Sequence, residues 1–182
     1  MNRNAAIILA LSCLLASWGA SASSQTNANR PAAPVDQPSN ANTLLTVSGL
    51  GPASESAQFS LQDLMAFPET TLMCVDPWTK DAHTFAGVSL AGLMQRLRMP
   101  GGAKGIELTA DNGYTVGIRL ADLARLGYVL AYRMDGGLLR DQVRVRNRGA
   151  LVVAFDLAAH PELNPSVYRY QFAYQVRAIH VR

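Results

Sequence analysis

The sequence predicts one α+β domain over residues 43–182, with a mixed, mainly antiparallel sheet and short helices. Runs rich in β-branched and aromatic residues are short and numerous, which is typical of strands joined by turns. Short helical patterns lie between some of these runs without regular alternation, so a parallel doubly wound sheet is not expected. The sequence contains no internal repeat.

The first half of the domain has strand patterns interrupted by two helix starts. Ser60-Leu61-Gln62-Asp63 is a capping-box pattern that begins a brief helix through Ala66, and Pro68 ends it. Ser89 caps a second helix from Leu90 to Leu97, whose apolar residues share one face. The strands predicted in this half cover residues 44–50, 58–59, 70–75 and 83–85.

The second half of the domain begins with a hairpin. Asp111-Asn112-Gly113 joins two strand-like runs, and Asn and Gly tolerate the positive φ that tight turns need. A short helix is predicted from Leu120 to Leu126, and a turn at Asp135-Gly136-Gly137. The predicted strands are 106–110, 114–118, 129–134, 151–155 and 176–181.

The first 22 residues have the layout of a signal peptide. A positive charge at Arg3 precedes an apolar run over residues 5–16, and Ala20-Ser21-Ala22 matches a cleavage site. This run is shorter than the roughly 20 residues that cross a bilayer as a helix. We therefore expect a general secretory leader, delivery to a bacterial periplasm, and no membrane span after cleavage.

Residues 23–42 are polar and rich in Pro, Ala and Asn, so we expect a disordered linker there. Cys74 is the only cysteine after the leader, so no intramolecular disulfide can form. The formal net charge is +3, and lysine occurs only at Lys80 and Lys104. This small arginine excess hints at anion binding, but it is far from the basic stripe of a nucleic-acid-binding protein.

Several segments in this order resemble one known family. In the first half they are Phe59-Ser60-Leu61-Gln62-Asp63-Leu64, Cys74-Val75-Asp76-Pro77-Trp78 and Phe85-Ala86-Gly87-Val88-Ser89-Leu90. In the second half they are Asp111 to Tyr114, Leu130 to Tyr132, Asp135-Gly136, Gly149 to Val153 and His160 to Leu163. Together they resemble the molybdopterin-binding domain of sulfite-oxidase-type oxidoreductases, which sulfite oxidase, plant nitrate reductase and the periplasmic methionine-sulfoxide reductase catalytic subunit share.

The resemblance implies a sulfite-oxidase-like fold and a set of site residues. In catalytic members a cysteine thiolate binds molybdenum, and the matching residue here is Cys74, four residues before Trp78. The alternative is that Cys74 is a small buried apolar residue. The residues expected to bind the cofactor are Cys74, Trp78, Arg119, Arg146 and Arg148.

Two features argue against a loaded enzyme. A protein that carries a cytoplasmically inserted pterin must be exported folded by a twin-arginine signal, whereas this leader reads Met1-Asn2-Arg3-Asn4. The domain is also short beside the catalytic relatives, which use extra chain to wrap the pterin. In addition, Gly149-Ala150-Leu151 stands where the family has Gly-Pro-Leu.

One charge pattern and three histidines complete the candidates. Arg140, Arg144, Arg146 and Arg148 alternate, so on a strand they would share one face and suit phosphate or sulfate. A solvated edge strand is the alternative interpretation. The histidines, at positions 83, 160 and 180, lack metal-ligand spacing, so surface or capping roles are expected.

Three functional hypotheses follow. The first is a non-catalytic periplasmic binding or accessory domain that uses the pocket around Cys74, Trp78 and Arg119. Its partner would be a small anion or a membrane-bound signalling or redox protein. The second is a molybdenum-cofactor oxidoreductase that performs oxygen-atom transfer with Cys74 as metal ligand. The third is a redox-responsive thiol at Cys74, which would need exposure and a lowered pKa.

Overall fold

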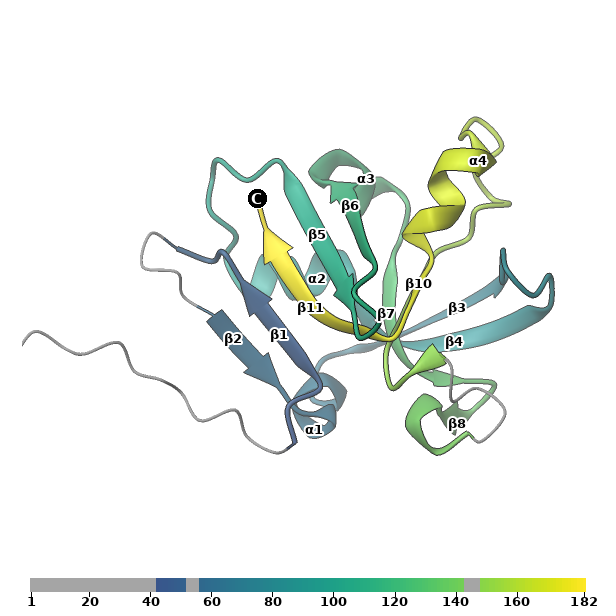
Figure 1. Cartoon of the computed structure of the whole chain (residues 1–182), viewed down its shortest axis with the longest axis horizontal. Helices are drawn as coiled ribbons and strands as arrows, with labels where there is room; N and C mark the ends of the chain where they lie inside the picture. The colour runs from purple at the N-terminus through teal and green to yellow at the C-terminus, as the bar shows by residue number, and fades with distance from the viewer. Residues whose placement is uncertain (1–41, 52–55, 143–147) are drawn as a thin grey trace, which may run out of the picture. The chain divides into compact units, whose positions relative to one another are not determined.

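The computed structural model describes residues 42–51, 56–142 and 148–182, which form two sheets and several short helices (Figure 1). Most strand pairs are antiparallel and the helices are short, so the predicted α+β class is confirmed. The strands are β1 (Leu45–Ser48), β2 (Ser56–Phe59), β3 (Glu69–Val75), β4 (Ala82–Ser89), β5 (Gly105–Ala110), β6 (Thr115–Arg119), β7 (Val129–Met134), β8 (Gly137–Leu138), β9 (Val152–Ala154), β10 (Ala173–Tyr174) and β11 (Val176–Val181). The α-helices are α1 (Leu61–Met65), α2 (Leu90–Arg96), α3 (Leu120–Arg125) and α4 (Pro165–Tyr168).

The first sheet has the strand order β2-β1-β11-β5-β6. Its central strand β11 runs parallel to β1, with Thr46 opposite Ala178, and the other neighbouring pairs are antiparallel. The pair β5–β6 is the predicted hairpin. Its turn has Gly113 at φ 82°, and Asn112 Oδ1 accepts the backbone N–H of Tyr114 at 3.0 Å. The hairpin turn therefore forms as the sequence predicts.

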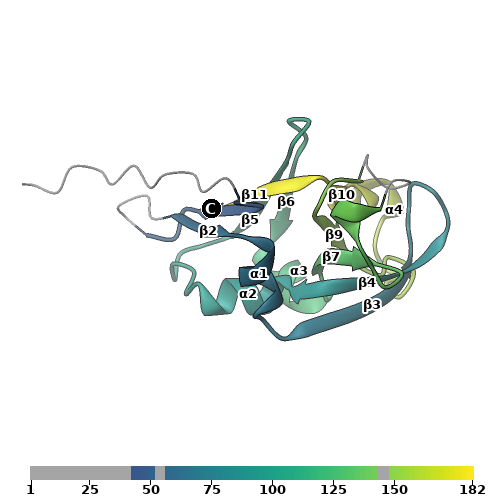
Figure 2. The same cartoon turned by 90° about the horizontal axis from the view of Figure 1, so that it is seen from below.

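The second sheet has the order β10-β9-β7-β4-β3, and β8 pairs with β7. Every pair in it is antiparallel. In Figure 2, β3 forms the outer edge of this sheet along the lower border of the molecule. The strand predicted at residues 83–85 is too short, because β4 continues to Ser89 while it pairs with β3 on one side and β7 on the other.

Close approach of two backbones explains a glycine in the middle of β4. The β4–β7 register shifts between Ala86 and Gly87. A Cβ atom built on Gly87 would lie 2.0 Å from the carbonyl oxygen of Leu130. Only glycine leaves room for the neighbouring strand at this bulge.

The helices begin where side chains can cap them. The predicted capping box is confirmed, since Asp63 N–H donates to Ser60 Oγ and the Asp63 carboxylate accepts from Ser60 N–H. Ser89 caps α2 as predicted. Helix α4 was not predicted, although Asn164 caps it and Pro165 occupies its first turn. In the described part of the chain, no helix is long and apolar enough to cross a membrane.

One apolar cluster joins the two sheets. It includes Val47 and Leu108 of the first sheet and Phe85, Leu130 and Val153 of the second, all at most 1% exposed. The burial of these apolar side chains supplies the main stabilisation of the fold. Cys74 is a free thiol. The fold therefore relies on this core and has no disulfide within residues 42–51, 56–142 and 148–182, as the cysteine count predicts.

The last crossing of the chain, from the second sheet to the first, is made by a single residue. Gln175 lies between β10 and β11, with φ of 57°, a conformation that non-glycine residues rarely adopt. Its N–H donates to the Arg148 carbonyl at 2.7 Å, and its own carbonyl accepts from Asp111 N–H at 2.9 Å. These two bonds hold the junction between Arg148 and the turn of the β5–β6 hairpin.

Candidate functional site

The turn between β3 and β4 is organised by one buried carboxylate. Asp76 is fully buried, and its Oδ1 accepts the backbone N–H groups of Trp78 at 2.9 Å and Thr79 at 3.3 Å. The backbone of Asp76 also bonds to the far end of the turn, accepting from Lys80 N–H and donating to the Asp81 carbonyl, each at 2.9 Å. An Asp at the start of such a turn is a usual choice, because its short side chain reaches the backbone two residues on.

The second oxygen of Asp76 binds groups from distant parts of the chain. Arg148 Nη2 lies 3.0 Å from Asp76 Oδ2, and the Tyr174 hydroxyl donates to the same oxygen. The Arg148 guanidinium also stacks over the Tyr174 ring at 5.4 Å and contacts Met134 Sδ at 3.2 Å. Burial, helped by the bond to Asp76, raises the pKa of Tyr174, so this hydroxyl stays protonated. The result is a closed cluster of Asp76, Arg148 and Tyr174.

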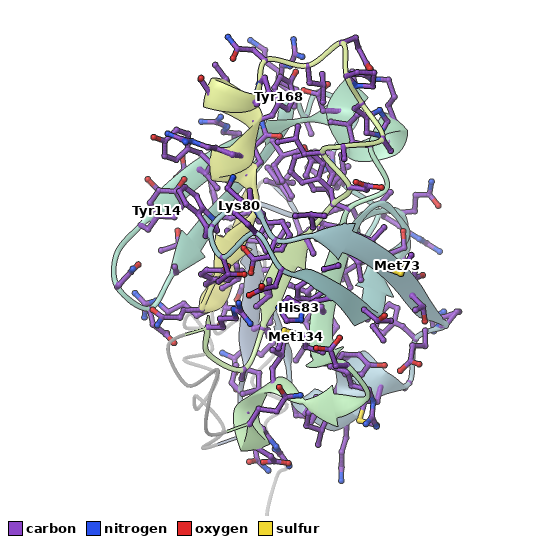
Figure 3. All side chains as sticks on the ribbon, turned by 90° about the vertical axis from the view of Figure 1, so that its right-hand side faces the viewer. Met73, Lys80, His83, Tyr114, Met134 and Tyr168 are labelled. Atoms are coloured by element: carbon purple, nitrogen blue, oxygen red, sulfur yellow. The ribbon has the colours of Figure 1, made fainter. Side chains whose placement is uncertain are left out.

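Cys74 lies just before this cluster, on the inward face of β3. It is 5% exposed, whereas its neighbour Met73, labelled in Figure 3, is 74% exposed. Burial, followed by the nearby carboxylates of Asp156 and Asp76, raises the pKa of the Cys74 thiol to about 12. The thiol is therefore neutral at physiological pH.

A histidine lies opposite Cys74 on the neighbouring strand, and it pairs with a carboxylate from the turn between β7 and β8. His83 is the cross-strand partner of Cys74 in the β3–β4 ladder. His83 Nδ1 lies 2.7 Å from Asp135 Oδ2, and Asp135 Oδ1 accepts the backbone N–H of Thr84 at 2.9 Å. Burial opposes ionisation of Asp135, but the bonds from Thr84 and His83 outweigh it and lower its pKa. His83 thus anchors the Asp135 turn, which is a structural role.

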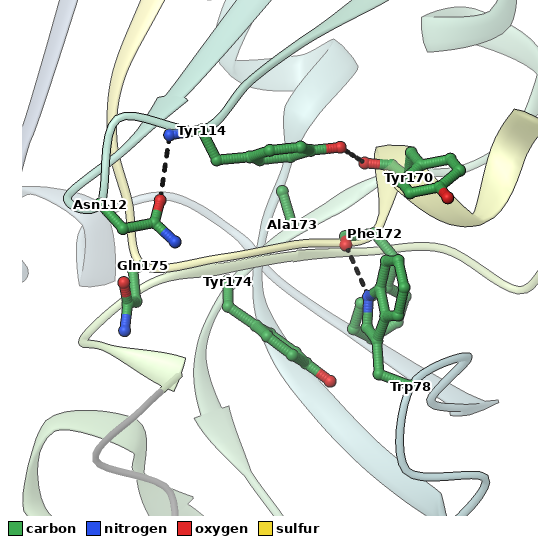
Figure 4. A pocket seen from close by; sticks show the side chains of 8 residues that line it. All are labelled: Trp78, Asn112, Tyr114, Tyr170, Phe172, Ala173, Tyr174 and Gln175. Atoms are coloured by element: carbon green, nitrogen blue, oxygen red, sulfur yellow. Dashed lines mark hydrogen bonds between the residues drawn. The ribbon is translucent and has the colours of Figure 1, made fainter.

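An open pocket lies on the other side of Trp78 and Tyr174 (Figure 4). Its volume is about 280 Å³, and most of its lining is aromatic. Trp78 Nε1 donates to the Phe172 carbonyl at 3.2 Å, and the Tyr114 hydroxyl donates to the Tyr170 carbonyl at 2.8 Å. The eight lining residues are Trp78, Asn112, Tyr114, Tyr170, Phe172, Ala173, Tyr174 and Gln175.

The structure brings together only part of the site predicted from the sequence. Cys74, Trp78 and Arg148 gather around Asp76. Arg119 instead ends β6 in the other sheet, where Asp122 Oδ2 at 2.8 Å and the Tyr168 hydroxyl at 2.9 Å hold its guanidinium. Arg146 lies outside the described residues.

The sequence predicted a row of arginines on one strand face. The structure contradicts this prediction at both described ends of the row. Arg140 lies in a 3-10 helix, Leu139–Asp141, rather than in a strand. Arg148 is buried against Asp76 rather than solvated. Alternation in the sequence was misleading here because neither end of the segment lies in a strand. Arg144, like Arg146, lies outside the described residues.

The remaining histidines have ordinary polar partners. His160 Nδ1 lies 3.4 Å from Glu162 Oε1, and His180 Nδ1 lies 3.0 Å from Ser48 Oγ. Among the residues that the structure describes, no group of three His, Cys, Asp or Glu side chains could hold a metal ion.

Two central residues escaped sequence reasoning. Asp76 carried a detectable signal, since an Asp followed by Pro-Trp-Thr between two strands indicates a turn whose backbone it caps. Tyr174 carried none, because its bond to Asp76 spans 98 positions in the sequence. The aromatic pocket depends on the same long-range approach.

Comparisons with known proteins agree with this fold. The model of the family described as the oxidoreductase molybdopterin binding domain matches residues 32–143, more than half of the chain. The sulfane dehydrogenase SoxCD from Paracoccus pantotrophus has a similar structure, with a TM-score of 0.56 and 14% identity. The match covers 75% of this chain and 37% of the SoxCD chain, so this chain spans well under half the length of that protein.

These matches establish the fold and the family. No curated protein matches the sequence. At 14% identity, the likeness to SoxCD shows the fold alone. The family match and the fold together confirm the resemblance seen in the segments around Cys74, Gly87 and Asp111. The chain belongs to the oxidoreductase molybdopterin-binding domain family.

Proposed function

We propose that this chain is an exported, non-catalytic binding or accessory domain of the periplasm, which keeps the family's fold without molybdenum chemistry. The observation that carries the proposal is the buried ion pair between Asp76 and Arg148. It places a carboxylate and an already neutralised arginine beside the cysteine that would bind the metal.

The molybdenum cofactor sets two requirements that can be compared with these residues. It is anionic, because it carries a phosphate and sulfur donors, so it needs free cations. Its protein ligand is a thiolate rather than a thiol. Cys74 has the right donor atom, and without a metal its burial and two neighbouring carboxylates keep it protonated, whereas a bound metal would displace that proton.

The two described arginines that were expected to bind the cofactor do not meet the first requirement. Arg148 is committed to Asp76, and Arg119 is committed to Asp122 in the other sheet. Neither of them offers this cofactor a free cation beside Cys74. We derive no catalytic step through it.

The ion pair has a structural explanation of its own. Removing one member of a buried pair leaves an uncompensated charge, which is strongly destabilising. Arg148 and Asp76 thus hold the β3–β4 turn against Tyr174, and they fill the place beside Cys74 with protein groups.

A second candidate function is a molybdenum-cofactor oxidoreductase that performs oxygen-atom transfer. The position of Cys74 at the end of β3, directly before the turn that carries Trp78, favours it together with the family match. In that case Cys74 would supply the metal ligand and the cofactor would supply the chemistry.

Metal analysis separates the two functions. The full chain with its own leader is produced in a host that makes molybdenum cofactor, and molybdenum and pterin are measured in protein from the periplasmic fraction. We expect no more molybdenum than in the Cys74→Ser variant. Stoichiometric molybdenum that the Cys74→Ser variant lacks would overturn the proposal, and recovery only from the cytoplasm would overturn its location.

A further inference from the structure

The pocket beside Trp78 is bounded by ring faces. Tyr114 and Tyr174 lie on opposite sides of it, and the small side chain of Ala173 lies between them at the floor (Figure 4). Trp78 closes one end, while the amides of Asn112 and Gln175 lie at the other end. This is a slot with flat apolar walls and a polar end.

The polar atoms of the aromatic walls are already used within the protein. The Trp78 Nε1–H, the Tyr114 hydroxyl and the Tyr174 hydroxyl donate to the Phe172 carbonyl, the Tyr170 carbonyl and Asp76, respectively. A ligand in the slot therefore meets ring faces rather than free donors on its long sides. Sugars, which need many hydrogen bonds, match this surface poorly.

One donor at the polar end is directed by the turn. Asn112 Oδ1 accepts the backbone N–H of Tyr114 at 3.0 Å, which fixes the orientation of the amide. The Asn112 NH₂ group then lies on the side that faces the slot (Figure 4). It can donate to an acceptor on a bound ring.

The eight lining residues include no ionisable acid or base other than tyrosine. Just outside them, Arg169 stacks on Trp78 at 5.7 Å and on Tyr170 at 4.9 Å. This guanidinium would repel a cationic ligand. The uncharged lining also offers no counterion to the phosphate of the molybdenum cofactor.

Backbone strain is held at the same end of the slot. Gln175 keeps its positive φ because two backbone bonds fix it, and a Cβ on Gly149 would come within 2.8 Å of the Gln175 Cα. Strained residues of this kind cluster at ligand sites.

We propose that this slot binds an uncharged, flat aromatic ring that carries a carbonyl or ring-nitrogen acceptor, with the ring between Tyr114 and Tyr174 and the acceptor at Asn112. The inference rests on the binding role proposed above, for which it names the class of ligand. Ring stacking supplies the affinity and the Asn112 NH₂ group the orientation.

Three small probes of matched size test the proposal. Benzamide has the flat ring and the acceptor, benzoate replaces the neutral group with a charge, and cyclohexanecarboxamide keeps the amide without the flat ring. Each is titrated into the full chain while the Trp78 indole N–H resonance is followed by NMR. We expect saturable shifts with benzamide, and binding weaker by about tenfold or more for the other two.

Variants assign the contacts. Tyr114→Ala removes one wall and should weaken benzamide binding about tenfold, whereas Tyr114→Phe keeps the ring and should bind within about threefold of the parent. Asn112→Asp keeps the acceptor for the turn but loses the donor, so it should also weaken binding. Met73→Ala, on the exposed face of β3, is the matched control and should change nothing.

Each outcome tests one part of the proposal. Equal binding of cyclohexanecarboxamide would overturn the requirement for a flat ring, and equal binding of benzoate would overturn the requirement for neutrality. Absence of benzamide binding would overturn the ligand class while leaving the molybdenum measurement, and thus the proposed function, unaffected. Stoichiometric molybdenum in a chain that binds benzamide would overturn the proposed function and leave this site standing.

Discussion

The Arg148 guanidinium lies 3.0 Å from the Asp76 carboxylate, and their side chains are 11% and 0% exposed. Asp76 belongs to the turn after β3, whereas Arg148 precedes β9. The pair therefore joins a hairpin end to a distant segment and uses both charges in doing so.

Asp76→Asn should destabilise the protein by about 3 kcal/mol, because it leaves the buried Arg148 without a counterion. Urea unfolding followed by circular dichroism measures the change. Asp81→Asn, in the exposed part of the same turn, is the control and should lie within about 0.5 kcal/mol of the parent. The double variant Asp76→Asn with Arg148→Met should recover part of the loss, and no recovery would contradict the ion-pair explanation.

The Cys74 thiol should react slowly with a thiol reagent in the native protein. Cys74 is 5% exposed, and this burial raises the pKa of its thiol to about 12, so little thiolate exists at pH 8. The rate is measured with Ellman's reagent in a Cys13→Ser background, with the urea-unfolded chain as control. Rapid native reaction would instead support a redox-responsive thiol.

The same pKa shift predicts a pH dependence of stability. The pKa of Cys74 is higher in the folded state, about 12, than the usual value of 9.0, so the thiol stabilises the fold fully below pH 9. This contribution is lost as the pH rises from 9 towards 12. Relative to Cys74→Ser, the parent should therefore lose stability above pH 9, and parallel curves would contradict this.

Asp122, in the first turn of α3, should make the stability of the protein sensitive to acid. Burial opposes its ionisation, but bonds from Arg119, Arg125 and Tyr168 outweigh burial and lower its pKa. The stabilisation is therefore present above the ordinary carboxyl pKa and is lost as the pH falls below it. Asp122→Asn should cost about 1–2 kcal/mol at pH 7 and progressively less below pH 4. A difference independent of pH would show that the charge of Asp122 is irrelevant.

Two glycine substitutions should have opposite effects. Gly87→Ala places a Cβ 2.0 Å from the Leu130 carbonyl oxygen and should cost more than about 3 kcal/mol. Gly92→Ala in α2 meets no atom closer than 3.5 Å and should stabilise the helix by up to about 1 kcal/mol. Thermal unfolding of the two variants measures both effects, and a tolerated Gly87→Ala would contradict the close approach at the bulge.

The sequence predicted the features that depend on residues close together along the chain. The capping box of α1 and the Asn112-Gly113 turn follow from local hydrogen bonds and allowed φ values, so the residue types alone were enough to predict both. The end of β4 could not be predicted in this way, because its last residues are held by β7, about 40 positions away.

The candidate site likewise contains some residues that a local motif identifies and others that only long-range packing brings in. Cys74 and Trp78 were identified through their motif, and they lie on either side of the buried Asp76. Arg119 was assigned to the same site, but it lies in the first sheet, where it pairs with Asp122. Tyr174 reaches Asp76 only through the long-range arrangement of the sheets, which no local pattern encodes.

The position of β11 in the middle of the first sheet has a consequence for how the protein forms. The strand separates β1 from β5, although it is made last of the described elements. During synthesis, β1 and β5 have no partner in common until Val181 has emerged from the ribosome. The first sheet is therefore built on a long-range pairing between the first and the last of the described strands, a topology that is typical of slow folding.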